Sequence, residues 1–439
     1  MENKFYKNES KHKLKTFVIG FPRIGEKREL KVATEKYFRS QITENELRDI
    51  AKELRRKQWL IERENGVDFI TAGDFSFYDN MLDTAALLNC LPERYNRLDL
   101  TTSLKKYFAA ARGYQGERGD VKALAMKKWF NTNYHYIVPE IDDDTRISVA
   151  GTKIFEEYAE AKAAGIETVP ALIGGFTFLK LAKFTGTKTP SDFIEYTAAA
   201  YIEIVKRLIA QGAKSIRFDE PYLVTDITSD DIGLFEELYE RILSVKGKCQ
   251  IYLQTYFGDI RDCYERVTAL DFDGIGLDFV EGDSLALLQK YGFPKTKTLF
   301  AGIISGKNIW RTRYKDVLAL IGEINKYSND IVIGASCSLL HVPYTVKNEP
   351  KLGDARTKYL AFAIEKLAEL NELGTLYAEG DTASDYKKNE ELFSAPRYKP
   401  NAAVAAEVAA LKPADFVRLP EFSERRRIQK AVLGLPLLP

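Results

Sequence analysis

Histidine and cysteine are scarce in this sequence of 439 residues, which has three histidines and four cysteines. His12, His135 and His341 lie far apart along the chain, and no His-x-His, HExxH or Cys-x-x-Cys spacing occurs. The spacings that usually mark a zinc site are therefore missing, and we expect no metal to be bound by this chain alone. The widely separated cysteines are typical of reduced thiols in a cytoplasmic protein, not of a disulfide framework.

An excess of charge of either sign is also missing. Lys and Arg number 64 and Asp and Glu number 63, so the formal net charge is +1. A neutral surface does not attract polyanions, which argues against nucleic acid or an anionic membrane as a partner. The first apolar run, Phe17–Phe21, is too short for a signal peptide. No later run approaches the roughly 18 apolar residues of a membrane-spanning helix.

The motifs of several enzyme classes are absent as well. No GxSxG, P-loop or GxGxxG pattern occurs, so hydrolase, nucleotide triphosphatase and dinucleotide-binding hypotheses have no motif in their support. The sequence does have 45% hydrophobic residues, which is enough for a large core.

Short apolar runs rich in β-branched residues alternate with helical patterns along the chain. Such alternation predicts parallel strands joined by crossover helices, and runs that are apolar on both faces are typical of strands buried on both sides. We predict eight strands, at 16–21, 67–72, 168–174, 215–219, 249–255, 273–279, 298–304 and 331–337. The clearest helical patterns cover 45–64, 191–211, 232–245, 314–326 and 354–373. The fold class is therefore α/β, a (β/α)8 TIM-type barrel whose working face lies at the carboxyl ends of the strands.

Two segments exceed the eight repeating units. Residues 74–167 form a long insertion after the second strand, far beyond an ordinary loop. Beyond about residue 376 the chain is rich in proline and has one Ala-rich helical pattern at 402–411, which is typical of a connector. We predict a barrel over 1–375 and a helical connector over 376–439. The chain stops on the apolar run LGLPLLP, and we expect a further segment to follow.

The run GFPRIGEKRELK, from Gly20 to Lys31, passes from a predicted strand through a turn into a helix start. Free backbone N–H groups, the positive end of a helix dipole and the cations Arg23, Lys27 and Arg28 together suit carboxylates or phosphates. The alternative is a solvated first turn with ordinary surface charges, which residue patterns alone favour.

The run KWFNTNYHYIVPE, from Lys128 to Glu140, places Asn131 and His135 among aromatic residues. This combination is found in binding sites, but also in structural hydrogen-bond networks, where a single histidine is more often found.

A third run, FDEP at Phe218–Pro221, ends a predicted strand with two acids. Successive strand residues point to opposite faces, so only one of Asp219 and Glu220 can face the barrel axis. A glycosidase-like pair would need a partner such as Asp74 or Asp278.

Taken together and in order, the runs resemble the N-terminal half of cobalamin-independent methionine synthase over nearly the whole chain. The runs that carry the resemblance are GFPRIGEKRELK, GDFSFYD, LPERY, YFAAARG, KWFNTNYHYIVPE, DEP, SCSLLH and LPLLP. The resemblance implies a two-barrel, zinc-dependent methyltransferase. That enzyme moves a methyl group from 5-methyltetrahydropteroyltri-L-glutamate to L-homocysteine and gives methionine.

The resemblance also implies site residues. Those matching the family's folate and polyglutamate contacts are Lys27, Arg28, Glu29, Leu30 and Lys128, with Arg23, Asn131 and His135 as possible additions. A triglutamate tail is a polyanion, and several cationic contacts are needed to hold it.

The family's zinc and homocysteine ligands lie in its second barrel. In this barrel the equivalent positions read Gln254, Tyr256, Asp278 and Cys337, and neither Gln nor Tyr replaces an imidazole or thiolate. The resemblance therefore predicts no catalytic residue and no metal in this chain, and zinc only in the complete enzyme. We expect the chain to be inactive alone and to need the missing barrel, in cis or in trans.

Two alternatives remain open from the sequence. One is a non-catalytic module that binds polyglutamylated folate or docks a separate catalytic barrel. The other is an independent barrel enzyme that uses Asp219 or Glu220 with Asp74.

Overall fold

Eight short strands form one parallel sheet in the computed structural model, which describes residues 12–98, 103–116, 119–380, 383–394, 401–436 and 438. The strands are β1 (Lys15–Phe17), β2 (Thr71–Ala72), β6 (Val169–Ile173), β8 (Ser215–Asp219), β9 (Gln250–Gln254), β10 (Gly274–Asp278), β11 (Thr298–Ile304) and β12 (Ile331–Ala335). Each overlaps one of the eight predicted strands, although β1 and β2 are shorter than predicted, with three and two residues. Their order in the sheet is β1-β12-β11-β10-β9-β8-β6-β2, and every pairing is parallel.

The sheet curls until its two end strands meet. Phe17 at the end of β1 forms a parallel bridge with Phe69, two residues before β2. The backbone N–H groups of Asp68 and Phe69 both donate to the carbonyl of Thr16, at 3.1 and 3.0 Å. Inside the curl, the rings of Phe17, Tyr252 and Phe300 pack edge to face or tilted, with centroids 4.7–5.3 Å apart. The interior is therefore filled by side chains.

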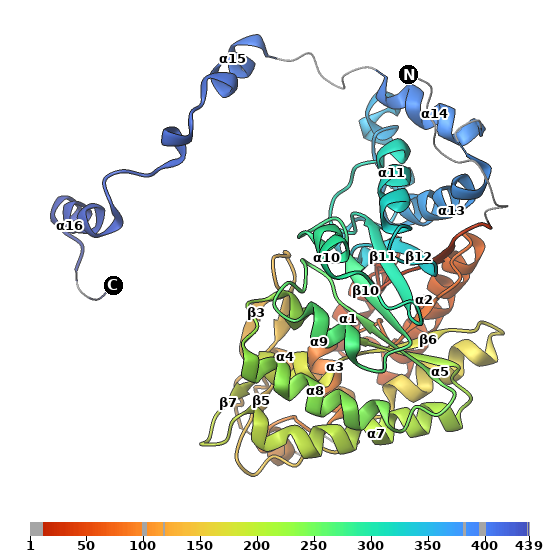
Figure 1. Cartoon of the computed structure of the whole chain (residues 1–439). Coiled ribbons are helices and arrows are strands. Elements are labelled where there is room, and N and C mark those ends of the chain that lie inside the picture. The colour runs from red at the N-terminus through yellow and green to blue at the C-terminus, as the bar shows by residue number, and fades with distance from the viewer. Residues whose placement is uncertain are drawn as a thin grey trace. The chain divides into compact units, whose positions relative to one another are not determined.

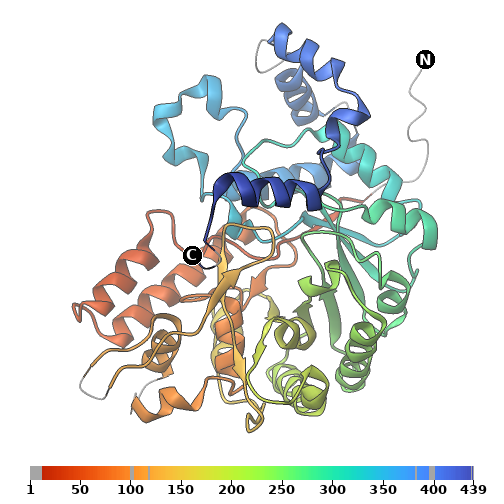
Figure 2. The same ribbon diagram turned by 90° about the vertical axis from the view of Figure 1, so that its left-hand side faces the viewer.

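Helices follow the strands and cover the outside of the sheet (Figures 1 and 2). They are α1 (Glu29–Phe38), α2 (Glu44–Glu64), α6 (Gly175–Leu181), α7 (Ile194–Ala210), α8 (Ser229–Leu243), α9 (Tyr264–Ala269), α10 (Ser284–Tyr291), α11 (Tyr314–Ile324), α12 (Asp354–Thr357), α13 (Ala363–Glu379) and α14 (Ser384–Phe393). In α2 the Thr43 side chain caps the Glu46 N–H and the Glu46 carboxylate returns to Thr43, while Leu47 and Trp59 are buried. Capping and a periodic apolar face together define this helix, as the sequence predicts.

One predicted helix is interrupted. The pattern over 354–373 gives the short α12, then an irregular stretch, then α13. In that stretch Leu360 bridges Trp310, and the Ala361 N–H donates to the Ile309 carbonyl at 2.9 Å. Pairing with a distant segment replaces the helical hydrogen bonds here, which local periodicity does not reveal.

The insertion between β2 and β6 is built from α3 (Asn80–Leu87), α4 (Ser103–Arg112), α5 (Lys153–Ala163) and a β-hairpin. The hairpin pairs β3 (Met126–Lys128) with β4 (His135–Ile137), and Lys128 lies opposite His135. Next along the chain, β5 (Glu140–Ile141) pairs in parallel with β7 (Lys183–Phe184). The insertion is thus a folded structure, and its apolar cluster around Tyr95 and Phe108 also takes in Ala33 of α1 and Leu47 of α2.

By its contacts the chain divides into two units, residues 1–390 and 391–439. The first includes residues 376–390 of the predicted connector, where the Asn389 side chain bonds the backbone of Tyr314 and Thr312 at 2.9 Å. The second contains α15 (Ala402–Ala410) and α16 (Phe422–Leu433), neither of which has a buried residue. None of the described helices is long and apolar enough to cross a membrane. All four cysteines are buried, free thiols.

Candidate functional site

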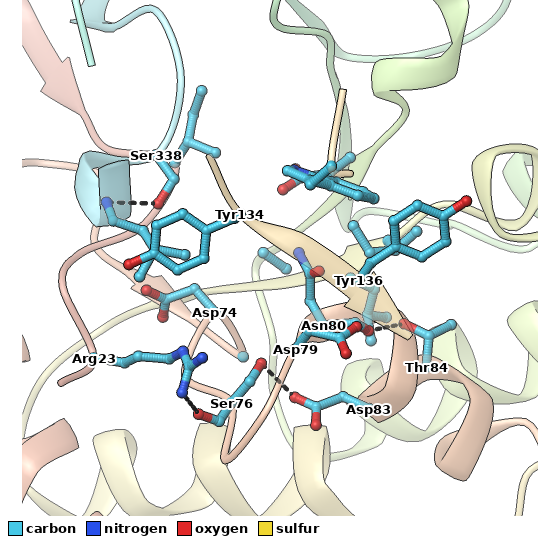
Figure 3. Close-up of a pocket in the computed structure, with 18 of the residues that line it drawn as sticks. Arg23, Asp74, Ser76, Asp79, Asn80, Asp83, Thr84, Tyr134, Tyr136 and Ser338 are labelled. Atoms are coloured by element: carbon cyan, nitrogen blue, oxygen red, sulfur yellow. Dashed lines mark hydrogen bonds between the residues drawn. The ribbon is translucent and has the colours of Figure 1, made fainter. Parts of the chain in front are cut away.

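A cavity of about 100 Å³ lies at the carboxyl ends of the strands, under the hairpin (Figure 3). Its walls include Arg23 after β1, Asp74 after β2, Asp219 at the end of β8 and Ser338 after β12. The hairpin contributes Trp129, Tyr134, His135 and Tyr136. The insertion therefore covers the face where an α/β sheet of this type places its ligands.

Arg23 lies in this cavity and is fixed by the insertion. Its guanidinium donates to the backbone carbonyls of Ser76 and Tyr78, at 2.7 and 2.5 Å. The Ser76 hydroxyl in turn donates to Asp83 at 2.7 Å, and Lys153 lies 3.3 Å from the same carboxylate. In Figure 3, dashed lines join Arg23 to Ser76 and Ser76 to Asp83. Arg23 thus has a structural role, because it attaches the loop after β1 to the insertion, and it also lines the cavity.

Asp79 joins the insertion helix α3 to the hairpin. Its carboxylate accepts from the N–H of Leu82, as the cap of α3, and from the N–H of Ile137 on β4 at 3.0 Å. Burial raises the pKa of Asp79 to about 7, although these two hydrogen bonds act in the opposite direction. The carboxylate therefore fixes the position of β4, and with it the position of His135.

Arg217 and Asp219 form a buried pair inside the sheet. The guanidinium bonds both oxygens of Asp219, at 2.7 and 3.3 Å, and also the carbonyls of Val18 and Ile19. Burial raises the pKa of Asp219, and the Arg217 charge opposes that shift. Glu220 faces the other way, where it accepts from the N–H groups of Phe176 and Thr177 at the start of α6. Only one of the two adjacent acids faces the interior, in agreement with strand alternation.

Asp74 is the residue that an independent barrel enzyme would use together with Asp219 or Glu220. Its carboxylate is also held by hydrogen bonds within the fold. It accepts from the N–H of Phe21 at 3.0 Å and from the Gln58 amide at 2.8 Å. Burial raises its pKa. Asp74 and Asp219 both line the cavity, whereas Glu220 is outside the set of described residues that line it.

The segment from Gly20 to Lys31 leaves the sheet as a buried stretch, forms a basic turn whose residues Glu26–Arg28 are exposed, and enters α1 at Glu29. Gly25 has a positive φ of 83° and Arg28, the residue before the helix, has φ 66°. A left-handed conformation is strained for arginine, and such strain is concentrated at functional positions. Lys27 is exposed, donates through Nζ to Asn348 Oδ1 at 2.6 Å, and through its N–H to the Glu29 carboxylate at 2.9 Å.

Leu30 occupies a different environment from its neighbours. It is 3% exposed and packs with Ala51 and Phe75 in a small apolar cluster. Its side chain stabilises α1 against α2, and the spacing Leu30, Ala33 of the two buried positions in α1 is the helical period that signals this role.

On the hairpin, Lys128 and His135 are exposed, and His135 also lines the cavity. Asn131, at the tip, is already engaged: it donates to Glu281 at 2.8 Å and accepts from Lys307 at 2.9 Å. Lys307 completes a triangle with Glu281, 2.6 Å away. We call Asn131, Glu281 and Lys307 the hairpin clamp. Sequence reasoning named Asn131 but missed the other two, because nothing local links residues 281 and 307 to the hairpin.

The positions that the resemblance sets against zinc ligands, Gln254, Tyr256, Asp278 and Cys337, do not fit zinc. The Gln254 amide bonds the Thr255 carbonyl at 2.9 Å, and the Asp278 carboxylate accepts from the N–H groups of Phe257, Val280 and Glu281. Burial raises the pKa of Cys337, so its thiolate is disfavoured. Across the described ranges, no group of three or more His, Cys, Asp or Glu side chains is arranged to hold a metal ion.

The family described as cobalamin-independent synthase, N-terminal domain, matches residues 15–329. The chain belongs to the cobalamin-independent methionine synthase family. It is 50% identical over 426 residues to the 5-methyltetrahydropteroyltriglutamate–homocysteine methyltransferase of Streptococcus thermophilus. The matched region covers 97% of this chain and 56% of that protein. The enzyme of the same name from Campylobacter jejuni is also 50% identical, over 427 residues and with the same two shares.

This member of the methionine synthase family therefore spans about half the length of the curated relatives that it matches. Among solved structures, a vitamin-B12 independent methionine synthase of Listeria monocytogenes superposes with a TM-score of 0.58 and 15% identity, covering 84% of this chain and 98% of that one. One from Shewanella gives a TM-score of 0.52 at 15% identity, covering 81% and 92%. At this identity the likeness shows the shared fold.

Proposed function

We propose that this chain is the folate-polyglutamate-binding half of a methyltransferase that moves a methyl group from 5-methyltetrahydropteroyltri-L-glutamate to L-homocysteine. The observation that carries the proposal is the 50% identity over 97% of the chain to enzymes bearing that name. We also propose that the curled sheet is a closed (β/α)8 barrel, since hydrogen bonds join its end strands. Residues 376–439 would then lead toward a second barrel.

The basic turn supports a tail-binding role. Lys27 and Arg28 are exposed beside the start of α1, and Lys128 is exposed on β3. A γ-linked triglutamate has several carboxylates, and charge-assisted contacts from separate cations add to hold it. Because the contacts are exposed, each contributes about 0.5–1 kcal/mol, and screening by salt weakens them. Leu30 would contribute only through its backbone, since its side chain is buried.

The chain is proposed to be inactive alone. Homocysteine attacks through sulfur, and a bound zinc ion favours the reactive thiolate near neutral pH. Gln254 and Asp278 are committed to other hydrogen bonds and do not fit that metal. The residues that activate the thiol must therefore come from another barrel.

The test is calorimetric titration with 5-methyltetrahydropteroyltriglutamate. We expect saturable binding that weakens with salt, and an affinity about tenfold lower in the variant Lys27→Ala, Lys128→Ala. The matched control is Lys206→Ala, Lys248→Ala, which removes two exposed lysines outside the basic turn and the hairpin. Equal affinities in both variants would reject the tail contacts. Methionine formation by the unassisted chain would reject the proposed inactivity.

A further inference from the structure

The strand-end cavity contains polar groups that the fold does not use. The Asn80 carboxamide and the Tyr134 hydroxyl line it, and neither forms a hydrogen bond with a described residue. Nδ1 of His341, another lining residue, is buried and has no partner. Asp74 accepts both of its hydrogen bonds on Oδ2, which leaves Oδ1 without one from the described residues. Unmet polar groups that converge on one cavity are typical of a site for a polar ligand.

Most of the charged side chains on the lining already have a partner. Arg217 pairs with Asp219 at 2.7 Å, and Lys153 lies 3.3 Å from Asp83. The oxygens of Asp79 accept two backbone N–H groups, and burial raises the pKa of this carboxyl to about 7. These groups therefore present little net charge to a ligand.

Arg23 and Asp74 are the charges on the described lining that remain without a counter-ion. Both guanidinium hydrogen bonds of Arg23 go to neutral backbone carbonyls, so its positive charge is not offset. Burial and the nearby Asp74 charge raise the pKa of Glu62 well above its usual range, so Glu62 holds a proton and the negative charge stays on Asp74. One positive and one negative group are thus left for a ligand.

The unmet groups are brought together by contacts across the cavity wall. A Cβ atom on Gly20 would lie 2.8 Å from Ser338 Oγ and 3.0 Å from Asp74 Oδ2, so both oxygens lie against this glycine. His341 follows Ser338 by three residues, and its ring centroid is 5.3 Å from that of Tyr134. Figure 3 shows Ser338, Tyr134, Asp74 and Arg23 in this order from the upper to the lower left of the view.

We propose that the strand-end cavity binds a small α-amino acid in its zwitterionic form. Arg23 and the Asn80 amide receive the carboxylate of the ligand, and Asp74 Oδ1 receives its ammonium group beside the ring of Tyr134. The cavity of about 100 Å³ has room for about three water molecules at roughly 30 Å³ each, so only a short side chain fits. Lys27 and Lys128 are outside its described lining, so the site is separate from the proposed folate contacts.

The test is calorimetric titration of the unmodified chain with glycine and L-alanine. Acetate and methylammonium are the matched probes, because each supplies one of the two charges, and L-leucine is the probe of size. We expect saturable binding of glycine or alanine. Acetate and methylammonium should bind about tenfold more weakly or worse, and leucine should also bind more weakly because its side chain exceeds the space.

Variants locate the site. Tyr134→Phe and Asn80→Ala each remove a group that has no partner in the fold, and each should lower the affinity for glycine about threefold or more. Asp74→Asn keeps an oxygen for the two N–H donors and should lower it further, because the anion is lost. Tyr196→Phe and Asn325→Ala are the matched controls outside the cavity. Urea midpoints verify that each variant is folded.

The outcomes decide the proposal independently of folate binding. No saturable binding of glycine or alanine to the unmodified chain overturns it, as does binding of acetate or methylammonium with equal affinity. Unchanged affinity in both Tyr134→Phe and Asn80→Ala also overturns it, because the ligand would then lie elsewhere. The proposed function is decided by the separate titration with the triglutamate, so the failure of one proposal leaves the other untouched.

Discussion

At the scale of single residues, the Arg217 guanidinium on the lining of the strand-end cavity is held by several hydrogen bonds. It is buried and bonds Asp219, two backbone carbonyls and the Thr71 hydroxyl. These contacts tie β8 to β1 and β2, so the residue joins strands that are distant in sequence. Its i, i+2 spacing from Asp219 places both on the inner face. This spacing can be read in the sequence, but nothing in the sequence marks Arg217 as the residue that joins the three strands.

Replacing Arg217 by Met should cost about 3–5 kcal/mol of unfolding free energy, because Asp219 would be left buried without its counter-charge. Urea denaturation is the measurement. Arg207→Met is the matched control, since Arg207 makes an exposed pair with Glu203 on α7 and should cost less than about 1 kcal/mol. Similar midpoints for the two variants would contradict a structural role for the buried pair.

His341 makes a pH-dependent contribution. Burial lowers its pKa to about 4 from an ordinary value of 6.5, and the positive charge of Lys307 acts in the same direction. The native state therefore favours the neutral imidazole. The stability that this group contributes is complete above pH 6.5 and is lost as the pH falls toward 4.

The variant His341→Phe should lose less stability than the parent chain between pH 6.5 and 4. Phenylalanine keeps the edge contacts with Tyr134 and Phe257, and no hydrogen bond of Nδ1 is lost because that atom has no partner. Urea midpoints across this pH range are the measurement. A parallel decline in both proteins would show that His341 titrates normally.

At the scale of elements, the hairpin β3–β4 depends on distant loops for its position. The clamp attaches its tip to the loops after β10 and β11. Phe130 and Phe257 both have positive φ, 48° and 77°, and their rings lie 5.6 Å apart. Strained backbone conformations of this kind persist only where contacts with the surrounding structure hold them in place. The position of Lys128 on β3 therefore depends on the hairpin clamp and on the contact between Phe130 and Phe257.

We expect Lys307→Met to weaken triglutamate binding several-fold through the position of Lys128, without a direct contact to the tail. A double-mutant cycle measures this. If Lys307 acts through Lys128, adding Lys307→Met to Lys128→Ala should have little further effect on affinity. Lys307→Arg should restore most of the binding by keeping the ion pair with Glu281. Additive losses in the double variant would mean that Lys307 touches the ligand itself.

At the scale of the whole molecule, the two contact units differ in how much they bury. Residues 12–390 hold the apolar core, whereas α15 and α16 bury no side chain. Large apolar residues of the second unit, among them Phe416 and Phe422, are 76% and 66% exposed. The free energy of folding therefore comes almost entirely from the first unit.

A chain ending at Ser394 should have nearly the same free energy of unfolding as the full chain, within about 1 kcal/mol, because α15 and α16 have no buried residue. Its solubility should rise, since exposed apolar side chains are lost. Urea denaturation and light scattering of both chains are the measurements. A large fall in stability would show that the second unit packs on the first in solution.

Much of the fold could be predicted from local pattern. All eight strands and most long helices follow from periodicity, because burial on both faces or on one stripe leaves a direct trace in sequence. Among the site residues, Lys27, Arg28 and Lys128 are exposed as a ligand contact requires. Their contact with a folate tail stays a prediction, as do those of Glu29 and His135. Leu30 is buried, and Arg23 and Asn131 are bound to other parts of the protein.

The sequence by itself determined the family, the strand and helix order, and the basic turn at Gly25, because these depend on neighbours along the chain. Only the tertiary structure decided that residues 281 and 307 clamp the hairpin, and that α12 and α13 are separate because residues 360 and 361 pair with residues 309 and 310. Each joins segments far apart in sequence. Their pairing is set by the curl of the sheet and by burial, for which no local pattern exists.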